Sequence, residues 1–153
     1  MKKSAFTISK LSPAQIDAAL ELFVVQLKEH GVETDAANVR KVMEKVVSDE
    51  RHGFILVATS ENGGIVGVAL GSSFLGLEHG GESGWLEELY VLPEWRQNGI
   101  GARLVEEAIR FAQQRGWRAL DLEVEANHLR VVPLYERNGF LPLTRSRFCL
   151  KLS

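Results

Sequence analysis

The chain has 153 residues, of which 45% are apolar and 25% are charged. These are the proportions of a globular protein of about one domain, and they exclude collagen-like, coiled-coil and disordered chains. The net charge of −2 argues against nucleic acid as a partner. No apolar run is long enough to span a membrane, and no signal-peptide core follows the start of the chain. We therefore expect a single domain, residues 1–153, in the cytoplasm and without a membrane partner.

The charges are unevenly distributed along the chain. They sum to 0 over residues 1–51, to −6 over residues 52–95 and to +4 over residues 96–153. The middle segment contains six glutamates and no lysine or arginine. A solvated acidic face would explain this segment, and so would a surface that meets a cationic ligand.

The first half of the chain is typical of two helices followed by two strands. A short strand is expected around Phe6–Ile8. Ser12-Pro13 and an apolar stripe that extends to Leu27 predict a helix that Gly31 ends. The other elements expected here are a helix over Asp35–Val47 and a hairpin with strands at Phe54–Thr59 and Ile65–Leu70.

The second half alternates between strands and helices. A glycine-rich loop over residues 76–84 leads into a predicted strand. The elements expected after this loop are a strand over Trp85–Val91, a helix over Ala102–Arg115, a strand over Leu120–Val124, a short helix over Val131–Arg137 and a terminal strand over Phe148–Leu152. This order predicts one layered α/β domain, in which a meander of strands is followed by a strand–helix–strand crossover.

The segment over residues 96–102, Arg-Gln-Asn-Gly-Ile-Gly-Ala, lies between a predicted strand and a predicted helix. Gly99 and Gly101 allow a tight turn, and the N–H groups of the helix start face outwards as an anion site. A dinucleotide fingerprint would need a glycine where Leu104 stands, and the Lys-Ser/Thr pair of a P-loop is missing. The segment predicts phosphate binding of another kind, unless it is an ordinary strand-to-helix turn.

A second motif lies downstream. It consists of the strand Leu122-Glu123-Val124, the polar residue Asn127, the pair Leu134-Tyr135 in the short helix and the pair Gly139-Phe140 after it. Together with the pattern Q/R-x-x-G-x-G/A, matched by Arg96, Gly99 and Gly101, this motif resembles the GNAT superfamily of acyl-CoA-dependent N-acyltransferases. The two segments cover about a third of the chain. The resemblance implies a GNAT-like domain, with a mixed central sheet of about six to seven strands and about four helices.

The resemblance also implies how acetyl-CoA is held. Main-chain groups of the strand would bind the pantetheine arm, and the glycine turn would bind the pyrophosphate. The implied cofactor-binding residues are Leu89, Tyr90, Val91, Arg96, Gln97, Asn98, Gly99, Ile100, Gly101, Ala102, Asn127 and Tyr135. Asn127 stands eight residues before Tyr135, whereas many relatives have seven, so Asn127 is the weaker assignment. No metal is expected, because the chemistry needs none and the four histidines lack ligand spacing.

Transfer of an acyl group from a thioester to an amine requires two proton movements. An alkylammonium is only about one part in a thousand neutral at pH 7, and the thiolate leaves best when it is protonated. The resemblance places Tyr135 beside the sulfur as the acid, and the alternative is a tyrosine that packs in the core. For the base, Glu87 ranks first, Glu88 second and Glu123 third, and the alternative is a water chain.

The sequence thus predicts an acetyl-CoA-dependent N-acetyltransferase. The acceptor is expected to be a primary amine, and a small cationic molecule is favoured over a protein. Transfer to protein N-termini or lysines, transfer to alcohols and the use of longer acyl groups remain open, as does homodimer formation. The alternative from a different class is a non-catalytic acyl-CoA sensor or partner module.

Overall fold

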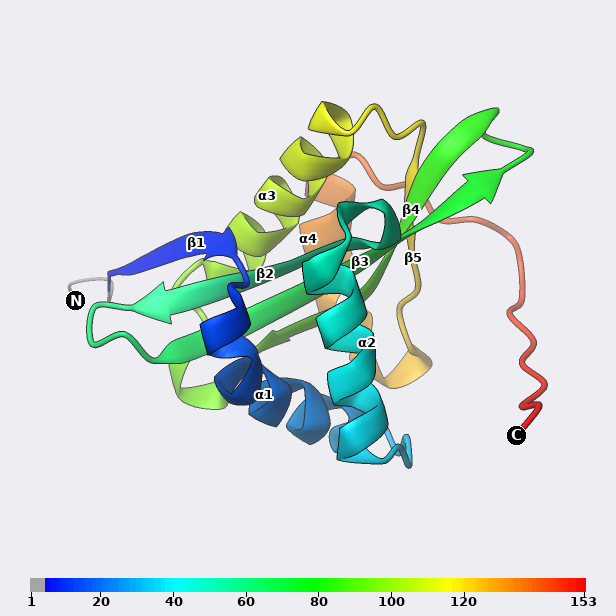
Figure 1. Ribbon diagram of the computed structural model, residues 1–153. Coiled ribbons are helices and arrows are strands. Elements are labelled where there is room, and N and C mark those ends of the chain that lie inside the picture. The colour runs from blue at the N-terminus through cyan, green and yellow to red at the C-terminus, as the bar shows by residue number, and fades with distance from the viewer. Residues whose placement is uncertain (1–4) are drawn as a thin grey trace. The chain divides into compact units, whose positions relative to one another are not determined.

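The computed structural model describes residues 5–153 (Figure 1). Residues up to Glu123 form one compact unit, and residues from Val124 onwards form a second. The strands are β1 (Phe6–Lys10), β2 (Gly53–Ser60), β3 (Ile65–Gly76), β4 (Gly81–Val91) and β5 (Leu120–Leu122). The α-helices are α1 (Ile16–Glu29), α2 (Ala36–Ser48), α3 (Ile100–Gln114) and, in the second unit, α4 (Val132–Arg137).

The five strands form one mixed sheet in the order β1-β2-β3-β4-β5. The first four strands pair antiparallel, and β5 adds to β4 in parallel. The parallel pair requires a crossover, which α3 supplies. Within residues 5–153, no helix combines the length and the apolar character needed to cross a membrane.

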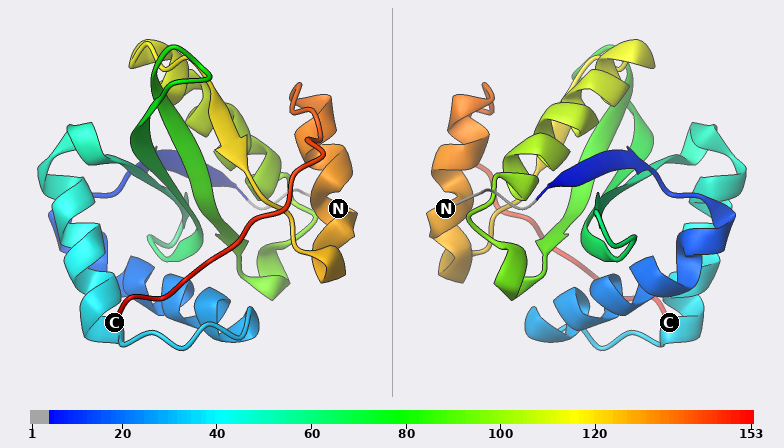
Figure 2. Two further views of the ribbon diagram at one scale, coloured as in Figure 1. Left: turned by 90° about the vertical axis from the view of Figure 1, so that its right-hand side faces the viewer. Right: turned by 90° about the vertical axis from the view of Figure 1, so that its left-hand side faces the viewer.

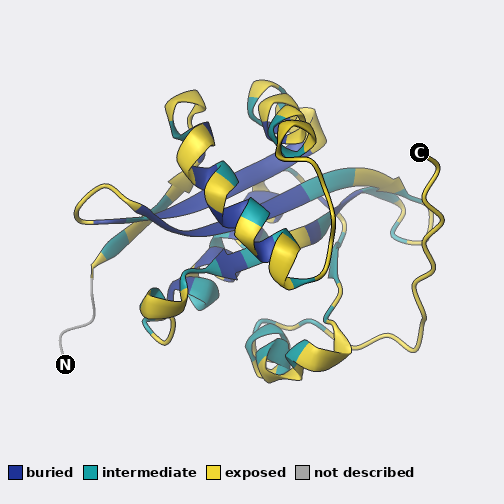
Figure 3. Cartoon of the chain, turned by 90° about the horizontal axis from the view of Figure 1, so that it is seen from below, coloured by how far each residue is buried: buried dark blue, intermediate teal, exposed yellow. Residues whose placement is uncertain are grey.

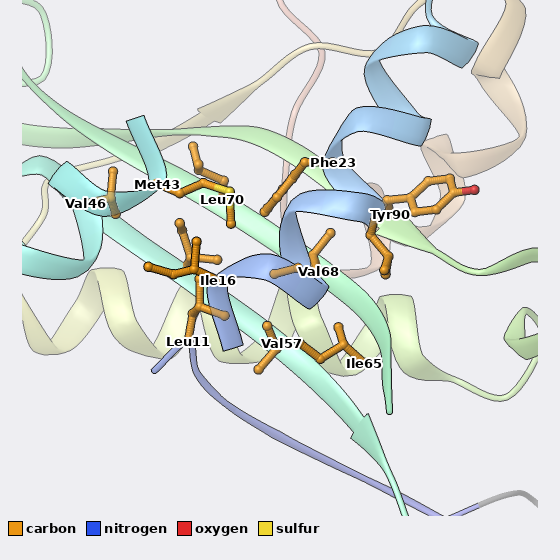
Figure 4. Close-up of a cluster of buried hydrophobic side chains, with 13 residues drawn as sticks. Leu11, Ile16, Phe23, Met43, Val46, Val57, Ile65, Val68, Leu70 and Tyr90 are labelled. Atoms are coloured by element: carbon orange, nitrogen blue, oxygen red, sulfur yellow. The ribbon is translucent and has the colours of Figure 1, made fainter. Parts of the chain in front are cut away.

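Helices cover both faces of this sheet (Figure 2). On one face, α1 and α2 pack over a core that includes Phe23, Met43, Val57 and Val68 (Figure 4). On the other face lies α3, which buries one side and exposes the opposite side (Figure 3). The sheet therefore separates two layers of helices.

Local side-chain contacts form at the starts of the first two helices. Ser12 and Gln15 form a capping pair, in which the Ser12 N–H donates to Gln15 Oε1 at 3.0 Å. A 3-10 turn over Pro13–Gln15 precedes α1. Asp35 caps α2 by accepting from the Ala37 N–H at 2.9 Å. Both α1 and α2 were expected at these places, and the structure confirms them.

Aromatic side chains fill the layer beneath α3. The ring of Phe54 on β2 lies 4.7 Å from that of Phe111 on α3 and 5.8 Å from that of Trp117, centroid to centroid. Trp117 also packs against Gly84 on β4, where a Cβ atom would overlap the indole ring. Gly84 is thus the position at which β4 makes room for this aromatic cluster.

The expected number of strands was wrong. Among the described residues the sheet has five strands instead of six to seven, although the strand expected around Phe6–Ile8 is present as β1. The terminal strand expected over Phe148–Leu152 is absent, and its side chains are exposed. Alternation gave this segment the pattern of a strand, but a strand needs a neighbour to bond its main chain, and no described strand pairs with it.

Some strand boundaries also differ from the expected ones. The glycine-rich segment over residues 76–84 was expected to be a loop, but β3 continues to Gly76 and β4 begins at Gly81. Pairing of Gly76 with Gly81 extends the hairpin, so that only residues 77–80 make the turn. In contrast, β5 ends at Leu122, two residues earlier than expected.

The contact between Gly84 and Trp117 predicts a loss of stability in Gly84→Ala. An added methyl group must displace the indole ring, and overpacking of this kind costs about 1–3 kcal/mol. The midpoint of thermal unfolding should fall accordingly. Gly64→Ala is the matched control, because its Cβ would lie 3.6 Å from Ser60 Oγ, an ordinary contact. Equal midpoints for the two variants would contradict the prediction.

Candidate active site

Strand β4 separates from β5 halfway along its length. The parallel pairing covers only Gly84 to Leu86, opposite Leu120 to Leu122. At the same point the pairing with β3 slips, because Leu70 lies opposite Glu88 and Gly71 opposite Leu86. Glu87 is therefore the extra residue of a β-bulge, which bends a strand and increases its twist. Beyond the bulge, the side of β4 that faced β5 is open within the first unit.

The register shows which main-chain groups lie at this open side. Leu92 N–H donates to Val66 O at 2.9 Å, and hydrogen-bonded pairs alternate along an antiparallel ladder. Tyr90, two residues earlier, therefore directs its main-chain groups towards β3. Leu89 and Val91 direct theirs away from β3. Of the three residues expected to bind the pantetheine arm, these two present N–H groups at the open edge.

Two side chains donate hydrogen bonds to the two carbonyl groups at this edge. Arg96 Nε donates to Val91 O at 2.9 Å. Gln26 Nε2, from α1, donates to Leu89 O at 3.1 Å. The carbonyls are thereby occupied on the same side on which the N–H groups of Leu89 and Val91 point. This side of β4 thus favours a ligand that brings hydrogen-bond acceptors.

The start of α3 follows directly on this edge. Gln97 (φ 64°) and Gly99 (φ 84°) both adopt the left-handed conformation, which is uncommon for a residue other than glycine. Asn98 Nδ2 braces the turn by donating to the carbonyls of Trp95 and Arg96 at 3.0 and 3.2 Å. A turn held in this way places the first N–H groups of the helix in a fixed array.

No side chain among residues 5–153 caps this helix start. Gly99 has no side chain to do so, and the first turn, which includes Ile100, Gly101 and Ala102, has no acidic residue. Four N–H groups at a helix start lack partners within the helix, and the helix dipole adds partial positive charge. The predicted strand-to-helix turn therefore has the geometry of an anion site. Ile100 anchors it, because its side chain is buried.

The three candidate carboxylates lie in different surroundings. Glu87, at the bulge, is exposed and accepts from Ser72 Oγ at 2.8 Å. Glu88 is half-buried in the ladder with β3. Glu123 is exposed and follows the end of β5. Glu87 is thus the carboxylate at the point where β4 and β5 separate, and a hydroxyl group orients it.

Tyr90 and Arg96 connect the open edge to α1. Tyr90 is buried, and its hydroxyl donates to Glu29 Oε1 at 3.3 Å. Burial, followed by the charge of Glu29, raises the pKa of the Tyr90 phenol. The Arg96 guanidinium lies 5.5 Å from the centre of the Tyr90 ring, within range of a cation–π contact. Arg96 is therefore held in place at the junction of β4 and α3.

Two expected site residues, Asn127 and Tyr135, belong to the second unit and are not among the residues that the first unit brings together. Asn127 is exposed in the 3-10 segment Ala126–Val131. Tyr135 lies on α4, and its ring meets that of Phe140 edge to face at 5.7 Å. Burial raises the pKa of Tyr135 to about 12, so the phenol keeps its proton at neutral pH.

Gln26 was not anticipated as a site residue. Only 3% of it is exposed, and it occupies the buried face of α1 together with Ala19 and Phe23. Its signal in the sequence is a polar residue at helical spacing within an apolar stripe. That signal is weak, because the sequence also placed Val24 and Leu27 in the apolar stripe, and both of these residues are only half-buried.

Residues 17–140 match the model of the acetyltransferase (GNAT) family. An N-acetyltransferase of Schizosaccharomyces pombe is 30% identical over 145 residues, which are 92% of this chain and 85% of that protein. The thialysine N-epsilon-acetyltransferase of Bos taurus is 33% identical over 66 residues, which are 43% of this chain and 39% of that protein.

Among solved structures, an aminoglycoside N-acetyltransferase in complex with CoA has the same fold. The TM-score is 0.82 at 18% identity, with 98% of this chain and 97% of that chain covered. The family match extends over most of the sequence, from α1 to the Gly139-Phe140 pair, and includes both motifs. The chain therefore belongs to the GNAT acetyltransferase family and is an N-acetyltransferase.

Proposed function

We propose that the protein transfers an acetyl group from acetyl-CoA to a primary amine, and that the amine is a small cationic molecule. The observation that carries the proposal is the continuity of two binding surfaces. The open edge of β4 offers the N–H groups of Leu89 and Val91, and it leads directly to the uncapped start of α3.

In this proposal the pyrophosphate of the donor binds the helix start at residues 96–102. The pantetheine arm, which contains two amides, lies along β4 and accepts from the N–H groups of Val91 and Leu89, as an added strand would. The arm then ends at Glu87, where β5 has separated from β4. Such a course brings the thioester to the carboxylate that ranked first as the base.

The chemistry needs one base and one acid. The nitrogen of the amine attacks the thioester carbon, its proton passes to Glu87 directly or through water, and the carbon–sulfur bond breaks. The leaving sulfur takes a proton from the Tyr135 phenol, which solvent then restores. Tyr135 carries its proton at neutral pH, as an acid must, although burial, which raises its pKa to about 12, makes the phenol a weaker acid.

Charge supports a cationic acceptor. Residues 52–95, which include all of β4, carry six glutamates and no lysine or arginine. Residues 96–153, which begin at the anion site, carry a net charge of +4. A cationic acceptor would meet a field of opposite sign at β4. Two relatives named for cationic amines, thialysine and an aminoglycoside, point to the same substrate class.

A panel of amines tests the function. Purified protein is given acetyl-CoA with thialysine, spermidine or kanamycin as cationic acceptors, and with glycine, glutamate or a peptide with a free N-terminus for comparison. Release of free thiol measures turnover. We expect the highest kcat/KM for a small cationic amine. A preference for neutral or acidic amines would contradict the acceptor class, and CoA binding without any turnover would favour a non-catalytic module.

Replacement of the carboxylates one at a time tests the base. Glu87→Gln should lower kcat/KM at pH 7 by about a hundredfold, the lower end of what general base catalysis contributes. The loss should shrink as the pH approaches that at which the amine is already neutral. Glu88→Gln and Glu123→Gln are the matched controls. A larger loss in either control would assign the base to that residue, and no loss in any of the three would favour a water chain.

Tyr135→Phe tests the acid. The change keeps the ring against Phe140 and removes the proton donor, so kcat should fall by roughly tenfold to a thousandfold. Because burial raises the pKa of Tyr135 to about 12, the phenol stays protonated between pH 6 and 10, and wild-type kcat should show no loss from this group over that range. Unchanged kcat in the variant would remove Tyr135 from the mechanism.

A further inference from the structure

Residues 148–152, near the end of the chain, lie outside every described helix and strand and expose their apolar side chains to solvent (Figure 3). Phe148, Leu150 and Leu152 are 90%, 83% and 89% exposed. They alternate with Cys149 and Lys151, so that in an extended chain the three apolar side chains share one face. A row of large apolar side chains in solvent is typical of an interaction surface. The segment therefore has the properties of a strand that lacks its neighbour.

Strand β5 also has an open side. It is the last strand of the described sheet and pairs only with β4. Leu120 and Leu122 lie opposite Gly84 and Leu86, on the face of the sheet that carries Trp117. Both leucines are only half-buried. The apolar layer beneath α3 thus ends at a strand edge, which can pair with a further strand and be covered by its apolar side chains.

The two segments carry charges of opposite sign. Residues 120–125 alternate between apolar and acidic side chains, with three acidic residues and no basic one. Residues 141–153 contain three basic residues and no acidic one. Opposite charges that face each other across two strands stabilise the pair, and like charges destabilise it. The charges therefore favour pairing of β5 with the C-terminal segment over pairing of β5 with itself.

One antiparallel register satisfies both the apolar and the charged faces. With Leu122 opposite Leu150, the other leucines of the two segments also meet, and Lys151 lies opposite Asp121. Asp121 contacts His79 Nε2 at 3.1 Å, and a carboxylate has enough lone pairs to accept from both side chains. The leucines of the added strand would then extend the apolar layer beneath α3.

The described residues of one chain contain both halves of this ladder and leave them unpaired. We infer that the protein forms a two-fold symmetric dimer, in which each copy adds residues 148–152 to the β5 edge of the other. Exchange of an identical segment around a two-fold axis is a common route to dimers, and it closes after two copies. A second copy provides a segment for each open edge, whereas an unrelated partner would cover only one of the two. The inference does not depend on the proposed acceptor.

The mass of the protein in solution tests the dimer. Light scattering after size exclusion is applied to the full chain and to its variants Leu150→Glu and Leu77→Glu. Leu77, in the turn between β3 and β4, is fully exposed and is the matched control for the same substitution outside the segment. We expect twice the chain mass for wild type and Leu77→Glu. We expect the single chain mass for Leu150→Glu, because pairing would bury its carboxylate against Leu122.

Circular dichroism checks that Leu150→Glu stays folded, as expected for a side chain that is exposed in the single chain. A monomeric wild-type protein would overturn the inference. Equal masses for the two variants would overturn it as well, because the association would then not depend on the C-terminal segment.

A disulfide shows which copy supplies the strand. Cys149 is the only cysteine and is exposed, and the register places it opposite Glu123. Oxidised Glu123→Cys should therefore migrate as a covalent dimer on a denaturing gel without reductant. Glu106→Cys, on the exposed side of α3, is the matched control and should remain a monomer. A disulfide within one chain would place the segment on its own β5 and overturn the exchange, and no disulfide in either variant would overturn the pairing.

Discussion

The loss of pairing between β4 and β5 after Leu86 is the constraint on which the rest of the site depends. Two parallel strands that stayed paired to their ends would bury the main-chain groups of Leu89 and Val91 in a ladder. The bulge at Glu87 coincides with the end of the pairing. An extra residue changes the twist locally, and β4 continues along β3 while β5 departs. One inserted residue thus creates an open strand edge inside a sheet.

An open strand edge exposes unpaired main-chain N–H and C=O groups, with which a strand of another chain can pair. Here the protein treats the two kinds of main-chain group differently. The carbonyls of Leu89 and Val91 are taken by Gln26 and Arg96, one from the layer of α1 and one from the turn before α3. The N–H groups on the same side are left to a ligand in our proposal. The edge therefore favours ligands that bring acceptors, as the carbonyls of pantetheine do, over another strand, which brings both.

The parts of the site that could be predicted from the sequence are those with local causes. Gly99 was singled out for its conformational freedom, and it adopts the left-handed conformation that the turn requires. The caps of α1 and α2 also depend on neighbouring residues only. Glu87 was ranked first from a resemblance of sequence, while the bulge that isolates it depends on the register with β3 and has no local signature.

Non-local causes explain what was missed. Phe148, Leu150 and Leu152 alternate as in a strand, yet alternation does not provide a partner. The hydrogen bond of Gln26 could not be inferred from the sequence, because its partner, the Leu89 carbonyl, is 63 residues away along the chain. In both cases the local sequence favours one arrangement, and the presence or absence of a contact with a distant segment determines what forms.

The two surfaces that we propose to bind the substrates are built from different kinds of atoms, and this difference bears on evolution. The anion site at the start of α3 is made of main-chain atoms, so most of its side chains can change without loss of the array. The surface proposed for the acceptor offers side chains, such as Glu87, which any substitution alters. Under the proposed function, a lineage could therefore exchange one acceptor for another while the main-chain array that meets the donor stays constant. The aminoglycoside N-acetyltransferase, which shares the fold at a TM-score of 0.82 with only 18% identity, shows how far side chains can differ while the main chain keeps the same course.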